Sequence, residues 1–254
     1  MKGLVTFFAL ITITQEKNTP GFYNERIVNG QNVKPGEIPY IVSLQNIGET
    51  NFCSGSILNK NYVVSAAHCF TRLRSDIKVI AGTTDLRNQN STHTVVRIIM
   101  HENYTRRDSL RNDIALLEVK SAFVESSFVK FVKLPRPHQK ITPATVAIVS
   151  GWGRKWKYGP ASPALLKSPT LITSENYCKR LIKGTGLKIY KTQICAIVTN
   201  MRTGPCNGDS GGPLTVRGRI VGITSWAIGC GSVKYPAVYT RVSEYLGWIK
   251  KNTE

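Results

Sequence analysis

The sequence has no apolar run long enough to cross a membrane, no repeated or low-complexity segment and no cysteine pair spaced for zinc. Its most apolar stretch, within residues 1–14, is shorter than the roughly 18 to 20 residues that a membrane-spanning helix needs. The lack of CxxC and CxxH spacings argues against a zinc cluster. A chain of 254 residues without these features is expected to be globular, with one large or two medium domains and a sizeable core.

Acidic residues are scarce. The chain holds 15 Asp and Glu against 34 Lys and Arg, which gives a formal net charge of +19 at pH 7. Such an excess favours attraction to acidic partners such as sulfated glycans, acidic protein substrates or anionic surfaces. The alternative is a strongly basic secreted protein whose charge serves only solubility.

The N-terminus, "MKGLVTFFALITIT", places Lys2 before a short apolar run, a pattern typical of a signal peptide. The alternative is a buried N-terminal strand. No small-x-small cleavage site follows, so the position of the cut stays open. We expect the protein to be secreted into the extracellular space.

In a secreted protein, an even number of cysteines predicts disulfide bonds, here up to three. The sequence alone leaves their pairing open. The six cysteines are Cys53, Cys69, Cys178, Cys195, Cys206 and Cys230. Two Asn-x-Thr/Ser motifs, at Asn90 and Asn103, are predicted glycan acceptors in the secretory route.

After residue 26 the periodicity is mostly that of short, β-branched strands separated by turn residues, which predicts an all-β sandwich or barrel. Only the end is expected to be helical, because Val242, Leu246 and Ile249 repeat at helical spacing over about 242–252. The proline-rich stretch 134–143 is interpreted as a linker between a unit at about 27–134 and a second at about 144–241.

The segment "GDSGG" at 208–212 suits a nucleophilic serine, because its glycines leave room for a substrate beside the Ser210 hydroxyl. Such a serine needs an imidazole to take its proton and a carboxylate to orient that imidazole. His68, in "VVSAAHC", and Asp113, at the head of the apolar strand "DIALLEV", are the candidates. The other three histidines sit in polar surroundings without such a context.

Six motifs occur in order: "IVNG" at 27–30, "SAAHC" at 65–69, "NDIALL" at 112–117, "GWG" at 151–153, "GDSGGP" at 208–213 and "SW" at 225–226. On these, residues 27–249 resemble the chymotrypsin/trypsin family of serine endopeptidases. The resemblance implies an all-β fold of two six-stranded antiparallel β-barrels with a C-terminal helix and the site between the barrels.

The resemblance also implies the role of each site residue. Ser210 would be the nucleophile, His68 the general base and then acid, and Asp113 the orienting carboxylate. The N–H groups of Gly208 and Ser210 would form the oxyanion hole. The implied bridges are Cys53–Cys69, Cys178–Cys195 and Cys206–Cys230. A further bridge of many relatives is lost as a pair here, with Ala147 and Val216 at its positions.

A basic residue, Arg26, directly precedes the start that mature family members share. By resemblance, residues 1–26 would be a signal peptide and a short activation propeptide, and 27–254 the protease domain. A trypsin-like protease would cut after Arg26, and the new ammonium of Ile27 would pair with buried Asp209. The uncut chain is then expected to be an inactive precursor.

The resemblance assigns the base of the specificity pocket to Gly204, where trypsin-like members carry an aspartate. Ala227 and Ala237 take the wall positions, where members that accept large aromatic rings carry glycine. We therefore predict cleavage after uncharged apolar residues, Leu and Met first, then Phe and Tyr, with Arg and Lys poor. Further expected substrate-binding residues are Pro205, Asn207, Ser225 and Trp226.

No cofactor or metal is expected. The loop in which some relatives bind calcium has one acid here, Asp85, too few for a cage of oxygen ligands. The basic and aromatic segment 154–160 is interpreted as a substrate-side loop, and nucleic acid is not expected as a partner. Protein or peptide substrates are the expected partners, and the protein is expected to be monomeric. The alternative function is a catalytically silent relative that binds acidic glycans or surfaces through its basic face.

Overall fold

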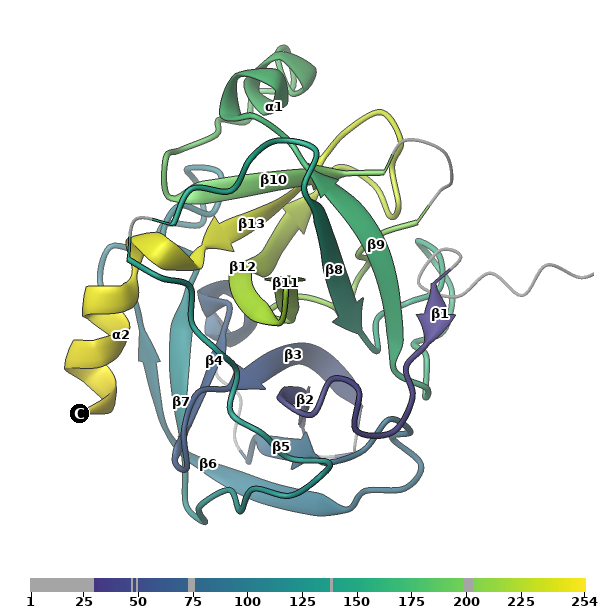
Figure 1. The fold of residues 1–254 in the computed structure, drawn as a ribbon, viewed down its shortest axis with the longest axis vertical. Helices are drawn as coiled ribbons and strands as arrows, with labels where there is room; N and C mark the ends of the chain where they lie inside the picture. Colours follow the sequence, from purple (N-terminus) through teal and green to yellow (C-terminus); the bar gives the residue numbers. More distant parts are fainter. Residues whose placement is uncertain (1–29, 47, 49, 73–75, 138, 199–202) are drawn as a thin grey trace, which may run out of the picture.

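The computed structural model describes residues 30–46, 48, 50–72, 76–137, 139–198 and 203–254. The expected signal segment, Arg26 and Ile27 lie outside the described residues. Two β-barrels make up the fold, the first in blue and the second in green and yellow (Figure 1).

The first barrel is closed in the order β2-β3-β4-β7-β6-β5, and β2 pairs with β5 to complete it. Most valine, isoleucine and leucine side chains of its strands are buried, and such β-branched and apolar residues favour strands. The strands are β2 (Ile41–Gln45), β3 (Asn51–Ile57), β4 (Tyr62–Ser65), β5 (Lys78–Ala81), β6 (Ser91–Met100) and β7 (Ala115–Val119).

The second barrel has the strand order β9-β10-β13-β12-β11-β8, and antiparallel pairing of β8 with β9 closes it. The two-residue strand β1 (Gln31–Asn32) adds to β9. The prediction of two six-stranded antiparallel barrels is thereby confirmed. The strands are β8 (Val146–Gly151), β9 (Leu166–Ile172), β10 (Gln193–Ile197), β11 (Pro213–Val216), β12 (Arg219–Ala227) and β13 (Ala237–Arg241).

Helices are short. The 3₁₀ helices are η1 (Ala67–Phe70) and η2 (Val242–Glu244), and the α-helices are α1 (Glu175–Leu181) and α2 (Leu246–Thr253). The expectation that only the chain end is helical was wrong, because α1 is also a helix. It was missed because it is too short to show an apolar repeat. Ser174 caps it by accepting a hydrogen bond from the Tyr177 N–H. No helix in the described part of the chain is long and apolar enough to span a membrane.

The C-terminal segment packs on the first barrel, although it follows the second barrel in sequence. Val242, Tyr245 and Ile249 are buried in the same cluster as the strands of the first barrel. Figure 1 shows α2 beside the blue strands of that barrel. The end of the chain therefore joins the two halves.

The three disulfides have the pairing that the family resemblance implied. Cys53–Cys69 joins β3 to η1, Cys178–Cys195 joins α1 to β10, and Cys206–Cys230 joins the two loops that flank β11 and β12. All six cysteines are therefore paired.

Candidate active site

His68 and Asp113 lie in hydrogen-bond contact, as the sequence analysis required of an orienting carboxylate. η1 follows β4 and carries His68, whose Nδ1 lies 2.7 Å from Asp113 Oδ2. The backbone N–H of His68 donates to Asp113 Oδ1 at 2.8 Å. Two bonds to one carboxylate fix both the imidazole and the turn that carries it. The disulfide sulfur of Cys69 lies 4.0 Å from His68 Nε2.

The carboxylate of Asp113 is completely buried, just ahead of β7. Burying an ion is costly unless hydrogen bonds compensate it. Besides its two bonds from His68, Asp113 accepts one from the Ser225 hydroxyl at 2.6 Å, and its backbone carbonyl accepts one from Thr240 Oγ1 at 2.6 Å. Because Ser225 and Thr240 belong to β12 and β13, the second barrel completes a site that begins in the first.

Ser210 sits on a turn clamped between the two barrels. Its carbonyl accepts a hydrogen bond from the Ser54 N–H of β3 at 2.7 Å, and the Gly211 N–H donates to the Thr224 carbonyl of β12 at 2.8 Å. A Cβ at Gly211 would lie 2.1 Å from Ser65 Oγ, and its φ is +79°, so only glycine fits. The position of Ser210 therefore depends on both barrels.

Two peptides beside Ser210 have fixed orientations. The Asn207 carbonyl accepts from the Arg154 N–H at 2.7 Å, and the Asp209 carbonyl accepts from the Gly212 N–H at 2.9 Å. In a trans peptide the N–H points opposite to the carbonyl. The N–H groups of Gly208 and Ser210 are thus directed away from these partners.

Asp209 is buried under the "GWG" motif. Its Oδ1 accepts from the Gly153 N–H at 2.8 Å and its Oδ2 from the Cys206 N–H at 2.9 Å. A Cβ at Gly151 or Gly153 would lie within 2.5 Å of the carboxylate oxygens, which explains why glycines flank Trp152. Burial raises the pKa of Asp209 to about 6, although the two backbone N–H groups act to lower it.

A cavity of about 410 Å³ brings the expected substrate-binding residues together with His68 and Ser210. Five of the expected substrate-binding residues line it: Pro205, Asn207, Ser225, Trp226 and Ala227. Lys157, Gly229 and Cys230 also line it. Lys157 belongs to segment 154–160, which was predicted to be a substrate-side loop. Gly229 was missed as a site residue, because only the folded chain brings its loop to the cleft.

A narrow second cavity of about 10 Å³ shares Pro205, Ala227 and Gly229 with the larger one. Gly204 and Ala237, the expected pocket base and wall, line it. Every described residue of its lining is uncharged; the others are Thr170, Ala196, Ile197, Val198, Thr203, Gly231, Ser232 and Tyr235.

The other described histidines lie elsewhere. His93 is buried, with Nε2 2.7 Å from Ser91 Oγ and its ring against Phe123. His101 packs against Trp248, and burial lowers its pKa. His138 lies outside the described residues.

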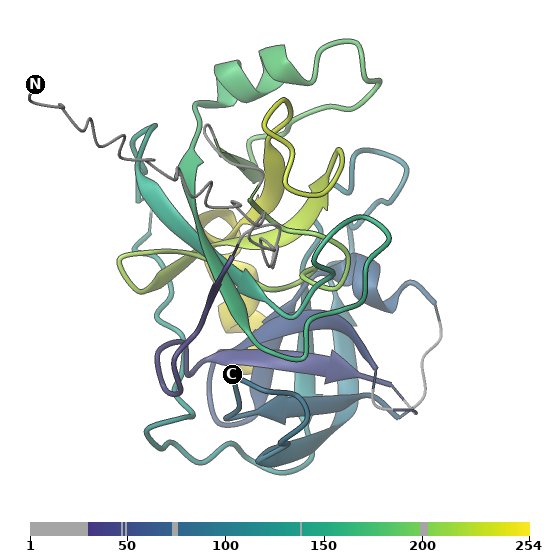
Figure 2. The ribbon, with the colours of Figure 1, turned by 90° about the vertical axis from the view of Figure 1, so that its right-hand side faces the viewer.

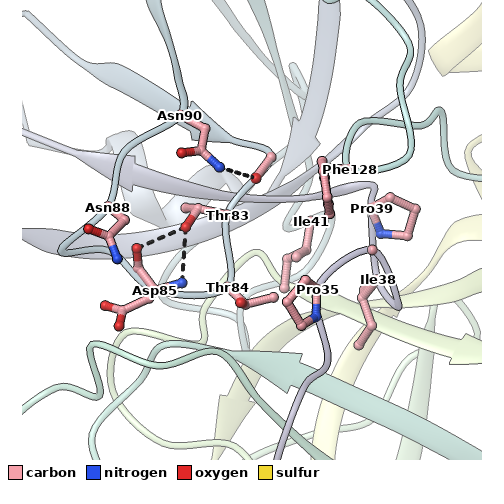
Figure 3. Close-up of a pocket in the computed structure, with 12 residues that line it drawn as sticks. Pro35, Ile38, Pro39, Ile41, Thr83, Thr84, Asp85, Asn88, Asn90 and Phe128 are labelled. Carbon is pink, nitrogen blue, oxygen red and sulfur yellow. Dashed lines mark hydrogen bonds between the residues drawn. The ribbon is translucent and has the colours of Figure 1, made fainter.

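A third cavity, of about 240 Å³, lies on the first barrel, and none of its lining residues is shared with the other two (Figure 3). Exposed Asn90 lies at its edge, where its Nδ2 donates to the Gly82 carbonyl at 2.9 Å. Asp85, the one acid in the loop where some relatives bind calcium, accepts hydrogen bonds from the Arg87 guanidinium, which lowers the pKa of Asp85. Asn103, the second predicted glycan acceptor, is exposed.

The two β-barrels place a buried Asp–His pair and a serine on a glycine-rich turn at one site. This arrangement defines a serine protease of the chymotrypsin class. The Trypsin family model matches residues 27–249. Trypsin epsilon of Drosophila erecta is 38% identical over 228 residues, 89% of this chain and 87% of that protein. The trypsin of Sus scrofa is 36% identical over 232 residues, 90% of this chain and 96% of that protein.

Among solved structures, neuropsin, a serine protease expressed in the limbic system of mouse brain, matches with a TM-score of 0.81 and 31% identity. The match covers 89% of this chain and 99% of neuropsin. The chain belongs to the trypsin family, and it is a serine endopeptidase.

Proposed function

We propose that this protein is a secreted endopeptidase, activated by cleavage after Arg26, that cuts after uncharged apolar residues with Ser210, His68 and Asp113 as its catalytic triad. The observation that carries the proposal is that His68, which is bonded to buried Asp113, lines the same cavity as Ser210. Proteins and peptides are its substrates.

In the first half of the reaction, Ser210 Oγ attacks the scissile carbonyl carbon while its proton moves to His68 Nε2. The electron pair of the C=O bond shifts to oxygen, and the N–H groups of Gly208 and Ser210 stabilise the resulting oxyanion. His68 then gives its proton to the leaving amine, the C–N bond breaks, and an acyl-enzyme forms. Asp113 stays ionised throughout and holds the imidazolium.

In the second half, water attacks the ester carbon of the acyl-enzyme, and His68 takes a proton from that water. The bond to Ser210 Oγ breaks as His68 returns the proton to the serine, which releases the new carboxyl terminus. The directions of the Gly208 and Ser210 N–H groups, set by the bonds of the neighbouring carbonyls, support their role in both steps.

The preference for apolar residues rests on the narrow cavity. Its described lining residues carry no charge that would bind Arg or Lys, and the methyl groups of Ala227 and Ala237 narrow it. The competing proposal is a preference for Arg and Lys, which the trypsin names of the relatives suggest. Gly204 at the expected pocket base has no carboxylate, which favours the preference for apolar residues.

Activation rests on Asp209. Its buried carboxylate has two backbone N–H groups as partners among the described residues, and its pKa is raised to about 6. An ammonium freed at Ile27 would supply the cation that an ionised Asp209 needs. Secretion rests on the N-terminal apolar run and on the three disulfides.

The test uses the full chain cut after Arg26 by an immobilised activating protease, which is then removed. kcat/KM is measured on four peptides that differ only in the residue before the scissile bond: Arg, Phe, Leu or Ala. We expect Leu or Phe to exceed Arg, and the Ser210→Ala protein to be inactive on all four. Arg as the preferred residue would contradict the assigned pocket. Cleavage that persists in Ser210→Ala would contradict the nucleophile, and no cleavage by the native enzyme would favour the silent, glycan-binding alternative.

A further inference from the structure

Residues 154–161, which we call the cleft hairpin, form an ordered turn beside the reaction site. Arg154 and Ala161 pair as an antiparallel bridge, and the Gly159 N–H donates to the Trp156 carbonyl at 2.9 Å. The Trp156 ring covers Gly159 so closely that a Cβ there would lie 2.5 Å from it. Both hydrogen bonds and packing therefore hold the tip.

The base of the cleft hairpin is attached to the catalytic turn. The Arg154 N–H donates to the Asn207 carbonyl at 2.7 Å, and Asn207 directly precedes Gly208. In Figure 2 the loop that follows β8 projects on the same side of the molecule as η1, which carries His68. Because this bond ties the hairpin to the peptide of Gly208, its tip has a defined place relative to Ser210.

Lys157, at the tip, is the one Lys or Arg among the described residues that line the large cavity, and no Asp or Glu lines it. Its side chain is exposed and takes part in none of the ion pairs of the described residues. Its Nζ lies 5.1 Å from the centre of the Tyr158 ring. Lys157 thus brings a positive charge without a carboxylate partner to the cleft that holds Ser210 and His68.

We propose that Lys157 determines a secondary specificity of the enzyme, a preference for an acidic substrate residue close to the scissile bond. The inference rests on the proposed function and concerns the subsites on either side of the pocket for the cleaved residue. An exposed ion pair of this kind changes kcat/KM by about two- to fivefold. Because salt screens such a pair, the preference weakens as ionic strength rises.

The test measures kcat/KM for peptides with Leu at the cleaved position and Asp or Asn at one neighbouring position at a time: P3, P2, P1′ or P2′. The Asp-to-Asn ratio is compared among the activated native enzyme, Lys157→Gln, Lys157→Glu and the control Lys155→Gln. Lys155 lies in the same hairpin but outside the cavity lining, and its substitution changes the net charge equally.

We expect a ratio of about two to five at one or more positions in the native enzyme and in Lys155→Gln, near one in Lys157→Gln and below one in Lys157→Glu. The native ratio should fall toward one when NaCl is raised from 50 mM to about 0.5 M. Ratios of one at every position, or ratios that Lys157→Gln leaves unchanged, would overturn the inference alone. Failure to cleave the Asn peptides in a Ser210-dependent manner would overturn the proposed function and this inference with it.

Discussion

The Ser225 hydroxyl, on β12 of the second barrel, donates a hydrogen bond of 2.6 Å to the Oδ2 atom of Asp113, which lies next to β7 of the first barrel. The same oxygen lies 2.7 Å from His68 Nδ1. One carboxylate oxygen therefore connects the imidazole to the second barrel. If Asp113 orients His68, the second barrel helps to set that orientation.

Substituting Ser225→Ala removes this donor from a completely buried carboxylate. A hydrogen bond to a charged group contributes about 1.5 to 3 kcal/mol, so we expect kcat/KM to fall by about 10- to 100-fold. The measurement is kcat/KM beside the free energy of unfolding. Thr240→Ser, which keeps a hydroxyl next to the Asp113 carbonyl, is the control and should change kcat/KM little. A loss below twofold in Ser225→Ala would contradict this role.

The Asp113→Asn variant should fold but lose activity. An amide cannot accept hydrogen bonds on both of its terminal atoms, so the bonding to the His68 N–H, His68 Nδ1 and Ser225 cannot all persist. We expect kcat to fall by about 10⁴-fold, the magnitude known for this change in other Ser-His-Asp triads. The readout is single-turnover kinetics, with circular dichroism as the check on folding. Retention of more than a tenth of the native rate would argue against Asp113 as the orienting group.

A negative charge placed at Ala237 should convert the specificity toward Arg and Lys. Ala237 lines the narrow cavity and belongs to β13, whereas Gly204 has a φ of +137° that penalises any side chain. We expect Ala237→Asp to raise the Arg-to-Leu ratio of kcat/KM by about tenfold or more and to lower the free energy of unfolding, because a carboxylate at this half-buried position loses part of its hydration. Ala237→Asn, equal in size but neutral, is the matched control and should leave the ratio unchanged. An unchanged ratio in Ala237→Asp would place the pocket elsewhere.

The uncut precursor should lose stability as the pH rises through the titration of Asp209. Burial raises the pKa of Asp209 to about 6, above the roughly 3.9 of an exposed aspartate. The folded precursor thus binds this proton more tightly than the unfolded chain does, and the stabilisation is present at pH 4 and lost by about pH 7. The expected loss of unfolding free energy over this range is about 2 kcal/mol.

The measurement compares urea unfolding of Arg26→Gln, which cannot be cut at this site, with unfolding of Arg26→Gln/Asp209→Asn. The difference in free energy of unfolding should fall by about 2 kcal/mol between pH 4 and pH 7. After cleavage of the native chain, pairing with Ile27 should abolish that fall. A difference that is independent of pH in the precursor would contradict the raised pKa.

Short β-branched runs between turn residues were sufficient to predict an all-β fold. The two barrels were predicted from the six ordered motifs through their resemblance to the chymotrypsin/trypsin family, and the same motifs singled out His68, Asp113 and Ser210 as candidates. Segment 154–160 was predicted to be a substrate-side loop, but the sequence did not single out Lys157 as the cavity-lining residue of that segment, because this depends on the folded hairpin, in which the Arg154 N–H donates to the Asn207 carbonyl. Helix α1 was missed because it has no apolar repeat. A cap at Ser174 and a disulfide at Cys178 stabilise it instead.

The packing of the C-terminus on the first barrel has a consequence for biosynthesis. Val242, Tyr245 and Ile249 are part of the core of a barrel whose last strand ends at Val119, more than a hundred residues earlier. A nascent chain grows from its N-terminus, so the first barrel cannot complete its core until residues 242–249 have left the ribosome. Translation products that stop before residue 242 lack this part of the core of the first barrel, and we expect them to form no active protease.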